Sequence, residues 1–296
     1  MARTKFSVVA ALLVSAHQVI GLAPAAAQRT QSIESILENV AAPSVAVWLE
    51  LADGKIPAIY KEEQTGMKQG AAVVVHDLGM NPDWPEVVTP LRNGLPTVGW
   101  TTLSISPPAL QGNVVPADMD ALQKATAEAL ESALKYLGAR GYENVALIGV
   151  GLGATVSAAF LANSPGHGVD AFIGINMAPF PATAPTLTPA VYLEKIALPI
   201  LDLYGERAAA GVRADSAARA LAAKKSGAAA RADQNIDPFK RSAVAQSPFD
   251  DKTGFIAYRQ IVVPGANPAF VGQEEILVKR IVGWLRRHAT GVTVQR

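Results

Sequence analysis

The chain has no cysteine among its 296 residues. This absence excludes disulfide bonds and thiolate chemistry, and it excludes a membrane anchor built on a lipidated cysteine. Histidine is also scarce, because the sequence holds only four, which are far apart. No stretch combines histidine and acidic residues at the spacing of a metal site. We therefore expect neither a metal nor a cofactor.

An excess of charge of one sign is missing as well. The formal net charge is +1 at pH 7, and no block of basic residues occurs in the sequence. Nucleic-acid-binding proteins carry a basic patch, so we expect no nucleic acid as a partner. Half of the residues are apolar, which is enough for a sizeable core. Beyond the N-terminal segment, no run is long and apolar enough to span a bilayer.

The N-terminal segment has the order of a secretory signal peptide. Arg3 and Lys5 precede an apolar stretch over 6–16, and Ala25-Ala26-Ala27 offers a cleavage site before Gln28. The apolar stretch is shorter than the about 20 residues of a membrane span. We expect cleavage of residues 1–27 and a periplasmic or secreted protein. An uncleaved N-terminal anchor is the alternative.

The apolar pattern alternates between strand-length runs and helices. Strands are expected over 43–51, 55–61, 71–76, 99–106, 144–148, 169–175, 198–204 and 258–263, and helices over 85–95, 118–137, 154–161, 212–225 and 273–288. Asp53-Gly54 joins the first two strands as a hairpin. This order predicts an α/β fold, with a mostly parallel sheet of about eight strands, an N-terminal β-hairpin and helices on both faces.

One glycine turn stands between a predicted strand and a predicted helix, Gly149-Val150-Gly151-Leu152-Gly153. A strand, a glycine turn and a helix form the context of the nucleophile elbow, G-x-S-x-G, whose central residue carries the attacking side chain. Here the central residue is Gly151, which has no side chain. Such a residue is usually held at a strained positive φ, and glycine relieves that strain.

The same glycines, with Ala154, also match the dinucleotide fingerprint G-x-G-x-x-A. That fingerprint normally lies in the first strand–turn–helix unit, whereas this turn follows about four earlier strands. It also requires an acidic residue at the end of the next strand, where this sequence has Asn176. A dinucleotide-binding protein is a remote alternative.

Four segments together resemble the α/β-hydrolase superfamily: the glycine turn and the stretches 73–79, 99–103 and 281–285. The chain looks most like a branch of exported bacterial proteins known only as a domain of unknown function. The resemblance covers about residues 30–290. It implies one α/β-hydrolase-like domain over 28–296, with a short Pro-rich cap segment over 178–197. A polar stretch over 227–253 is expected to be a surface excursion.

The resemblance assigns the three positions of a catalytic triad. It places the nucleophile at Gly151, the acid at Ala208 and the base at Asn267. Glycine and alanine offer no functional group, and asparagine cannot accept and return a proton at neutral pH. Glu206 could replace the acid if its loop shifted, although an exposed pair with Arg207 is the simpler interpretation. We expect no Ser-Asp-His triad.

The resemblance also implies an oxyanion hole formed by the backbone N–H groups of Leu78 and Leu152, beside His76. Such donors attract a carbonyl or carboxylate group even without a nucleophile. We therefore expect a pseudoenzyme that binds a small carbonyl- or carboxylate-bearing ligand, or a protein of the cell envelope, at this site. The alternative is an esterase with an unorthodox site, for instance Ser104 or Ser106 assisted by His76, so that enzymatic activity stays open.

Overall fold

The computed structural model describes residues 33–111, 119–179, 188–234 and 258–289. The predicted signal peptide, 1–27, lies outside these ranges. Residues 180–187 of the predicted cap segment and 235–253 of the predicted surface excursion also lie outside them. Within the described ranges, each helix is too short or too polar to cross a membrane.

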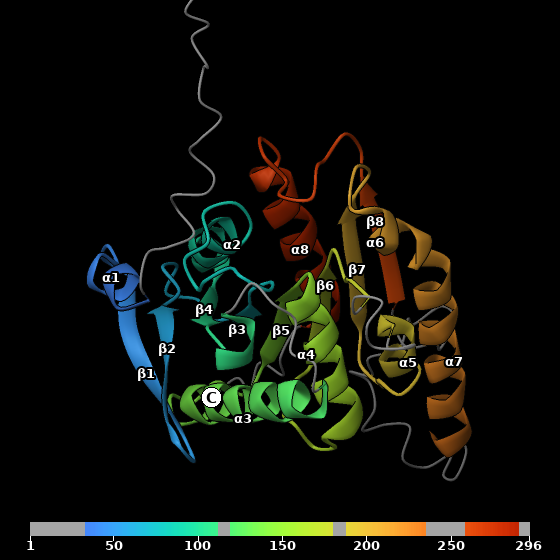
Figure 1. The fold of residues 1–296 in the computed structure, drawn as a ribbon, viewed down its shortest axis with the longest axis horizontal. Coiled ribbons are helices and arrows are strands. Elements are labelled where there is room, and N and C mark those ends of the chain that lie inside the picture. Colours follow the sequence, from blue (N-terminus) through green and yellow to red (C-terminus); the bar gives the residue numbers. More distant parts are fainter. Residues whose placement is uncertain (1–32, 112–118, 180–187, 235–257, 290–296) are drawn as a thin grey trace, which may run out of the picture. The chain divides into compact units, whose positions relative to one another are not determined.

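An eight-stranded sheet with the order β1-β2-β4-β3-β5-β6-β7-β8 runs through the described residues (Figure 1). The strands are β1 (Val45–Leu51), β2 (Gly54–Lys61), β3 (Gly70–Val75), β4 (Trp100–Ile105), β5 (Val145–Val150), β6 (Ala171–Ile175), β7 (Ile200–Gly205) and β8 (Tyr258–Val263). β2 pairs antiparallel with both β1 and β4, and the other pairings are parallel. The predicted mostly parallel sheet with an N-terminal hairpin is confirmed.

Helices cover both faces of the sheet, as predicted. They are α1 (Ile33–Glu38), α2 (Val88–Gly94), α3 (Met119–Gly138), α4 (Leu152–Asn163), α5 (Pro189–Leu193), α6 (Ala210–Ala214), α7 (Ser216–Gln234) and α8 (Glu274–His288), with short 3₁₀ turns η2 (Pro96–Val98) and η3 (Pro108–Leu110). Buried side chains of α3, α4, α5 and α7 pack on one face, and those of α2 and α8 on the other (Figure 1).

The central strands are buried on both faces, which explains their continuous apolar runs. In β3, Val73 and Val75 contact the cluster that includes α3 and α4, while Ala72 and Val74 contact the cluster under α2 and α8. Successive side chains of a strand point to opposite faces, so a slip of one residue would exchange these two sets. The register thereby fixes where each strand ends, and with it the position of the loops at the carboxyl edge.

The structure differs from the sequence prediction at several helices. The helix predicted over 212–225 is divided into α6 and α7, and α7 continues to Gln234, so residues 227–234 are helical rather than an irregular excursion. The alanine-rich run 228–230 has the highest helix propensity, which accounts for the extension. The helices α1 and α5 were not predicted because they are too short to show a helical period.

Candidate active site

The loops of interest leave the sheet at one edge. β3, β5, β6, β7 and β8 run parallel, so their carboxyl ends and the loops that follow lie on the same side. Gly151 follows β5, Ala208 follows β7, and Asn267 follows β8. The loop with His76, Asp77 and Leu78 follows β3. The fold thus brings every predicted site residue to a single edge of the sheet.

The turn after β5 has the backbone of a nucleophile elbow. Gly151 adopts φ 56° and ψ −121°, a conformation that residues with a side chain rarely adopt. Its N–H donates to the carbonyl oxygen of Ile175 at 2.8 Å, and its own carbonyl accepts the N–H of Ala178 at 3.3 Å. The expected positive φ at the centre of the turn is confirmed, and glycine is the residue that adopts it without strain.

The two predicted oxyanion donors converge on one atom, and that atom belongs to the chain itself. Oδ1 of Asp77 accepts the N–H of Leu78 at 2.8 Å and the N–H of Leu152 at 2.7 Å. A Cβ built on Gly151 would overlap the Asp77 carboxylate. Asp77 therefore occupies both the predicted oxyanion hole and the space where a side chain at position 151 would begin.

Opposing effects act on the charge of Asp77. Burial raises the pKa of its carboxyl group, while the hydrogen bonds from Leu152 and Leu78 lower it. The carboxylate also lies at the N-terminus of α4, where the helix dipole favours a negative charge. An anionic ligand cannot use these two N–H groups unless it displaces Asp77.

His76 and Ser106 form a buried pair beneath this loop. Nε2 of His76 lies 3.1 Å from Oγ of Ser106, and Nδ1 lies 2.7 Å from the carbonyl oxygen of Asp77. A carbonyl can only accept, so Nδ1 carries the proton and Nε2 accepts from the Ser106 hydroxyl. Burial lowers the pKa of His76 to about 4, which keeps the ring neutral at pH 7.

This order of hydrogen bonds matches that of a serine–histidine pair in a hydrolase. However, both side chains have no exposed surface, and Ser104 is equally buried with its hydroxyl donating to the carbonyl of Pro82 at 2.7 Å. The structure thus joins His76 to Ser106 and leaves Ser104 apart. Through Nδ1, His76 holds the backbone of Asp77 and so sets the position of its carboxylate.

The residue at the predicted acid position, Ala208, has no carboxylate. Ala208 is buried, and its N–H donates to the carbonyl of Gly205 at 2.9 Å. Glu206, the possible substitute, is exposed, and its Oε2 accepts the N–H of Gly265 at 2.7 Å. Arg207 donates to the carbonyl of the same Gly265. Glu206 and Arg207 therefore both stabilise the loop after β8.

Asp202, the acidic residue within β7, is paired with residues inside the fold and not with the Gly151 turn. Asp202 is fully buried and pairs with Nε of Arg219 in α7 at 2.8 Å. Its Oδ2 also accepts from the hydroxyl of Tyr258 at 3.0 Å and from Nε2 of Gln260 at 2.8 Å. This network satisfies the carboxylate inside the fold and joins β7, β8 and α7.

Asn267 closes a turn after β8. Its Oδ1 accepts the N–H groups of Ala269 and Val271, each at 3.1 Å. Its side chain therefore serves the local backbone, in the manner of an Asx turn. Among the described residues, no group of histidine, aspartate and glutamate side chains could hold a metal ion.

Two residues at this edge were missed by the sequence analysis. The first is Asn176, at φ 49°, which accepts the N–H of Gly205 at 3.3 Å and donates to the carbonyl of Pro268 at 2.7 Å. It ties together the loops that follow β6, β7 and β8, and its signal is an asparagine that directly follows a strand. The second is Asp77, whose signal is an acid directly before a predicted oxyanion donor, in a chain with glycine at the elbow.

The sequence model of a family described as "Protein of unknown function (DUF3530)" matches residues 14–129 and 113–235. No curated protein matches the sequence. Among solved structures, the chain is similar to a dienelactone hydrolase from Anabaena variabilis, with a TM-score of 0.57 and 16% identity over 83% of this chain and 98% of that one.

Two further structures show the same similarity. Est1E from Butyrivibrio proteoclasticus gives a TM-score of 0.54 at 10% identity, covering 82% of this chain and 98% of that one. XC6422 from Xanthomonas campestris, a serine hydrolase without a lid, gives 0.51 at 13% identity, covering 86% and 98%. At these identities the similarity establishes the fold, which is that of the α/β-hydrolases.

Proposed function

The chain belongs to the DUF3530 family, and we propose that it is a non-catalytic α/β-hydrolase relative that binds a ligand or partner at the edge around Gly151. One observation carries the proposal: the carboxylate of Asp77 accepts both N–H groups of the oxyanion hole. In a working hydrolase these donors stabilise the oxyanion of the transition state, so they must be open to the substrate. Here the donors are already satisfied in the folded chain.

The remaining positions support the same conclusion. Acyl transfer requires a nucleophile, a base that takes its proton and an acid that orients the base. Gly151 and Ala208 have no functional group, and the Asn267 side chain caps a turn. Loss of a whole triad costs on the order of 10⁶ in rate, which leaves only binding and oxyanion effects. With Asp77 in place, the oxyanion contribution is lost as well.

A second candidate is an esterase that uses Ser106 and His76, favoured by the 3.1 Å contact and by the proton on Nδ1. A substrate could reach this pair only after the loop of Asp77 moved, because both side chains are fully buried. The dinucleotide alternative has less support, since the strand after the glycine turn ends at Ile175 and is followed by Asn176 instead of an acidic residue. Titration with NADH tests that alternative separately.

The ligand class remains the one that the sequence predicts, a small carbonyl- or carboxylate-bearing molecule or an envelope protein. To bind at the N–H groups of Leu78 and Leu152, such a ligand must displace the Asp77 carboxylate that now accepts their hydrogen bonds. We also infer export of the chain, with cleavage after Ala27. The intact mass of the exported protein tests this inference, and a full-length mass in the membrane fraction would contradict it.

The experiment is active-site labelling of the mature protein with a fluorophosphonate probe, followed by intact mass measurement. We expect no added mass and no turnover of short acyl esters. A labelled Ser106 would favour the esterase instead, and turnover near roughly 1 per second, in the ordinary enzyme range, would overturn the proposal. An active serine hydrolase labelled in parallel controls for the reactivity of the probe.

A further inference from the structure

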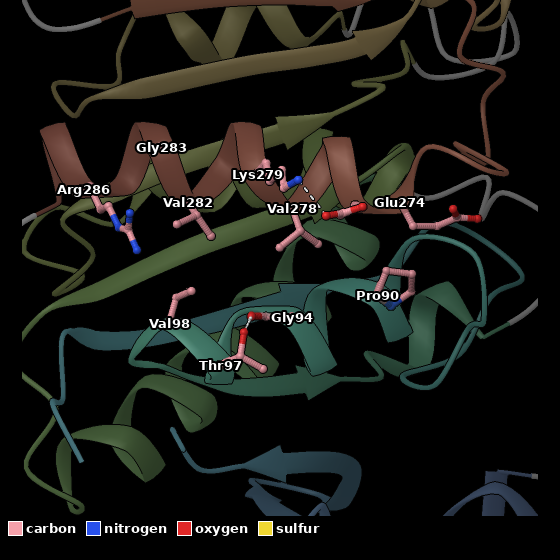
Figure 2. A pocket seen from close by; sticks show the side chains of 11 residues that line it. Pro90, Gly94, Thr97, Val98, Glu274, Val278, Lys279, Val282, Gly283 and Arg286 are labelled. Atoms are coloured by element: carbon pink, nitrogen blue, oxygen red, sulfur yellow. Dashed lines mark hydrogen bonds and ion pairs between the residues drawn. The ribbon is translucent and has the colours of Figure 1, made fainter. Parts of the chain in front are cut away.

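A groove of about 530 Å³ lies between α8 on one side and α2 with η2 on the other. Figure 2 shows Val278 and Val282 of α8 pointing toward Gly94 of α2 and Val98 of η2. Both helices pack on the face of the sheet opposite α3 and α4. The groove is therefore built from residues other than those around Gly151.

Two glycines shape the groove. A Cβ on Gly94 would lie 2.9 Å from Cγ1 of Val278, so α2 and α8 are in close contact at that point. A Cβ on Gly283 would meet no atom within 4 Å. The helices thus touch near Gly94, and there is free space beside Gly283, where Val98 and Val282 also line the groove.

The charged residues that line the groove differ in whether they have a hydrogen-bond or ion-pair partner. Oε1 of Glu274 accepts the N–H of Gly272 at 2.9 Å, and Lys279 pairs with Glu275 at 2.6 Å. Arg286 has neither an acidic nor a carbonyl partner within the described part of the chain. Its side chain points into the gap between the two helices (Figure 2). An apolar groove with acids at one end thus has an uncompensated cation at the other.

We propose that this groove binds a single-chain anionic amphiphile, a long-chain carboxylate, with its head on Arg286 and its chain along Val282, Val98 and Val278. A guanidinium favours a carboxylate because it can donate two parallel hydrogen bonds. Glu275 is already paired with Lys279, so Glu274 is the acid that repels a carboxylate from the opposite end and fixes the direction of the ligand. From Val278 to Arg286 the helix rises about 12 Å, a length that suits an extended alkyl chain.

The first experiment is calorimetric titration of the full mature protein with octanoate, decanoate and dodecanoate below their micelle concentrations. Each methylene group that enters the groove is expected to tighten binding about fourfold, the value for burial of one CH₂. Dodecanol should bind at least about fivefold more weakly than dodecanoate, because it lacks the charge that pairs with Arg286. Equal binding of dodecanoate and dodecyltrimethylammonium would overturn the proposal.

Matched variants locate the site. Arg286→Gln should weaken dodecanoate binding at least about fivefold, whereas Arg287→Gln, one residue further along α8 and outside the lining, should leave it unchanged. Equal effects of the two variants would assign the binding to general charge and contradict the proposal. Both arginines are exposed, so neither change should disturb folding.

Gly283→Leu fills the free space and should abolish binding, while Gly283→Ala, which also folds without a clash, should weaken it less. Unchanged binding in both variants would overturn the proposal. Dimers in sedimentation that dissociate on Gly283→Leu would assign the groove to a second copy instead. None of these measurements depends on the chemistry at Gly151, so they fail or succeed independently of the proposed lack of catalysis.

Discussion

The Gly151 turn and the α2–α8 groove differ in how their polar groups are satisfied. At the turn, the N–H groups of Leu78 and Leu152 both donate to Asp77, so the two predicted oxyanion donors have an internal partner. In the groove, Arg286 has no such partner among the described residues and lies beside apolar walls. The backbone geometry of an oxyanion hole therefore does not by itself identify a binding site, because a side chain of the same protein can already accept the hydrogen bonds of its N–H groups.

Gly151→Ser should produce the largest effect, a loss of about 3–5 kcal/mol in the free energy of unfolding. The serine Cβ would overlap Asp77, its backbone would be strained, and the displaced carboxylate would leave two N–H groups without a partner. Urea unfolding measures the loss. Gly283→Ser, placed in free space on α8, is the control and should change stability little.

In a double variant with Gly151→Ser, the change Asp77→Gly should recover part of the lost free energy of unfolding, because it removes the overlap between the serine Cβ and the Asp77 carboxylate. Strictly additive losses would show that Asp77 does not occupy the space beside Gly151. Neither single change should give esterase activity. A variant with Gly151→Ser, Ala208→Asp and Asn267→His should be less active than the same variant with Asp77→Gly, because the Asp77 carboxylate competes with the substrate for the two N–H groups; equal activity would contradict this competition.

Acidification should cost about 3 kcal/mol through His76 alone. Its pKa falls from 6.5 to about 4 on folding because the ring is buried, so the unfolded chain binds the proton more readily. The stability that the neutral ring contributes is present above pH 6.5 and is lost as the pH falls toward 4. Unfolding free energies of the parent and His76→Gln, measured across this range, should differ in slope.

That difference in slope separates His76 from the carboxylates that also titrate on acidification, since the latter are common to both proteins. Parallel curves would mean that His76 titrates normally. It would then be accessible, and the buried-pair description of His76 and Ser106 would be wrong.

Gly283→Ala should stabilise the protein by about 1 kcal/mol, because alanine is the better helix former and the added methyl group meets no atom. Gly94→Ala should destabilise it by about 1 kcal/mol or more, since its Cβ would lie 2.9 Å from Val278. The melting temperatures of the two variants test the close contact at Gly94 and the free space at Gly283. Opposite signs would place the free space beside Gly94 instead.

Asp77→Asn should have the smallest effect, a slight gain in stability near neutral pH. Burial raises the pKa of Asp77, so the stability contributed by this group is fully present below its ordinary pKa of 3.8 and is lost as the pH rises through the folded value. Asparagine keeps an oxygen for the two N–H groups and has no charge to bury. The gain should vanish at low pH, and a loss at neutral pH would show that the charge itself is favoured there.

Most of the fold could be predicted from the sequence because both-face burial leaves apolar runs of strand length, as in β3 and β5. The elbow could be predicted from its glycines. The role of Asp77 could not, because its partner Leu152 lies 75 residues away and the contact depends on how two loops meet. The groove was missed for the same reason: Val98 and Val282 look like ordinary core residues until α2 and α8 pack together.

The overlap between Asp77 and the space above Gly151 also limits the order in which substitutions can accumulate. A chain that acquired serine at 151 first would pass through an intermediate with strained backbone and a displaced carboxylate, and marginally stable proteins tolerate few such steps. A chain that first replaced Asp77 by a small residue would avoid the displaced carboxylate and would have only the backbone strain of serine at 151. The mutational path from this protein to a serine nucleophile therefore begins at the loop after β3, away from the residue that would carry the chemistry.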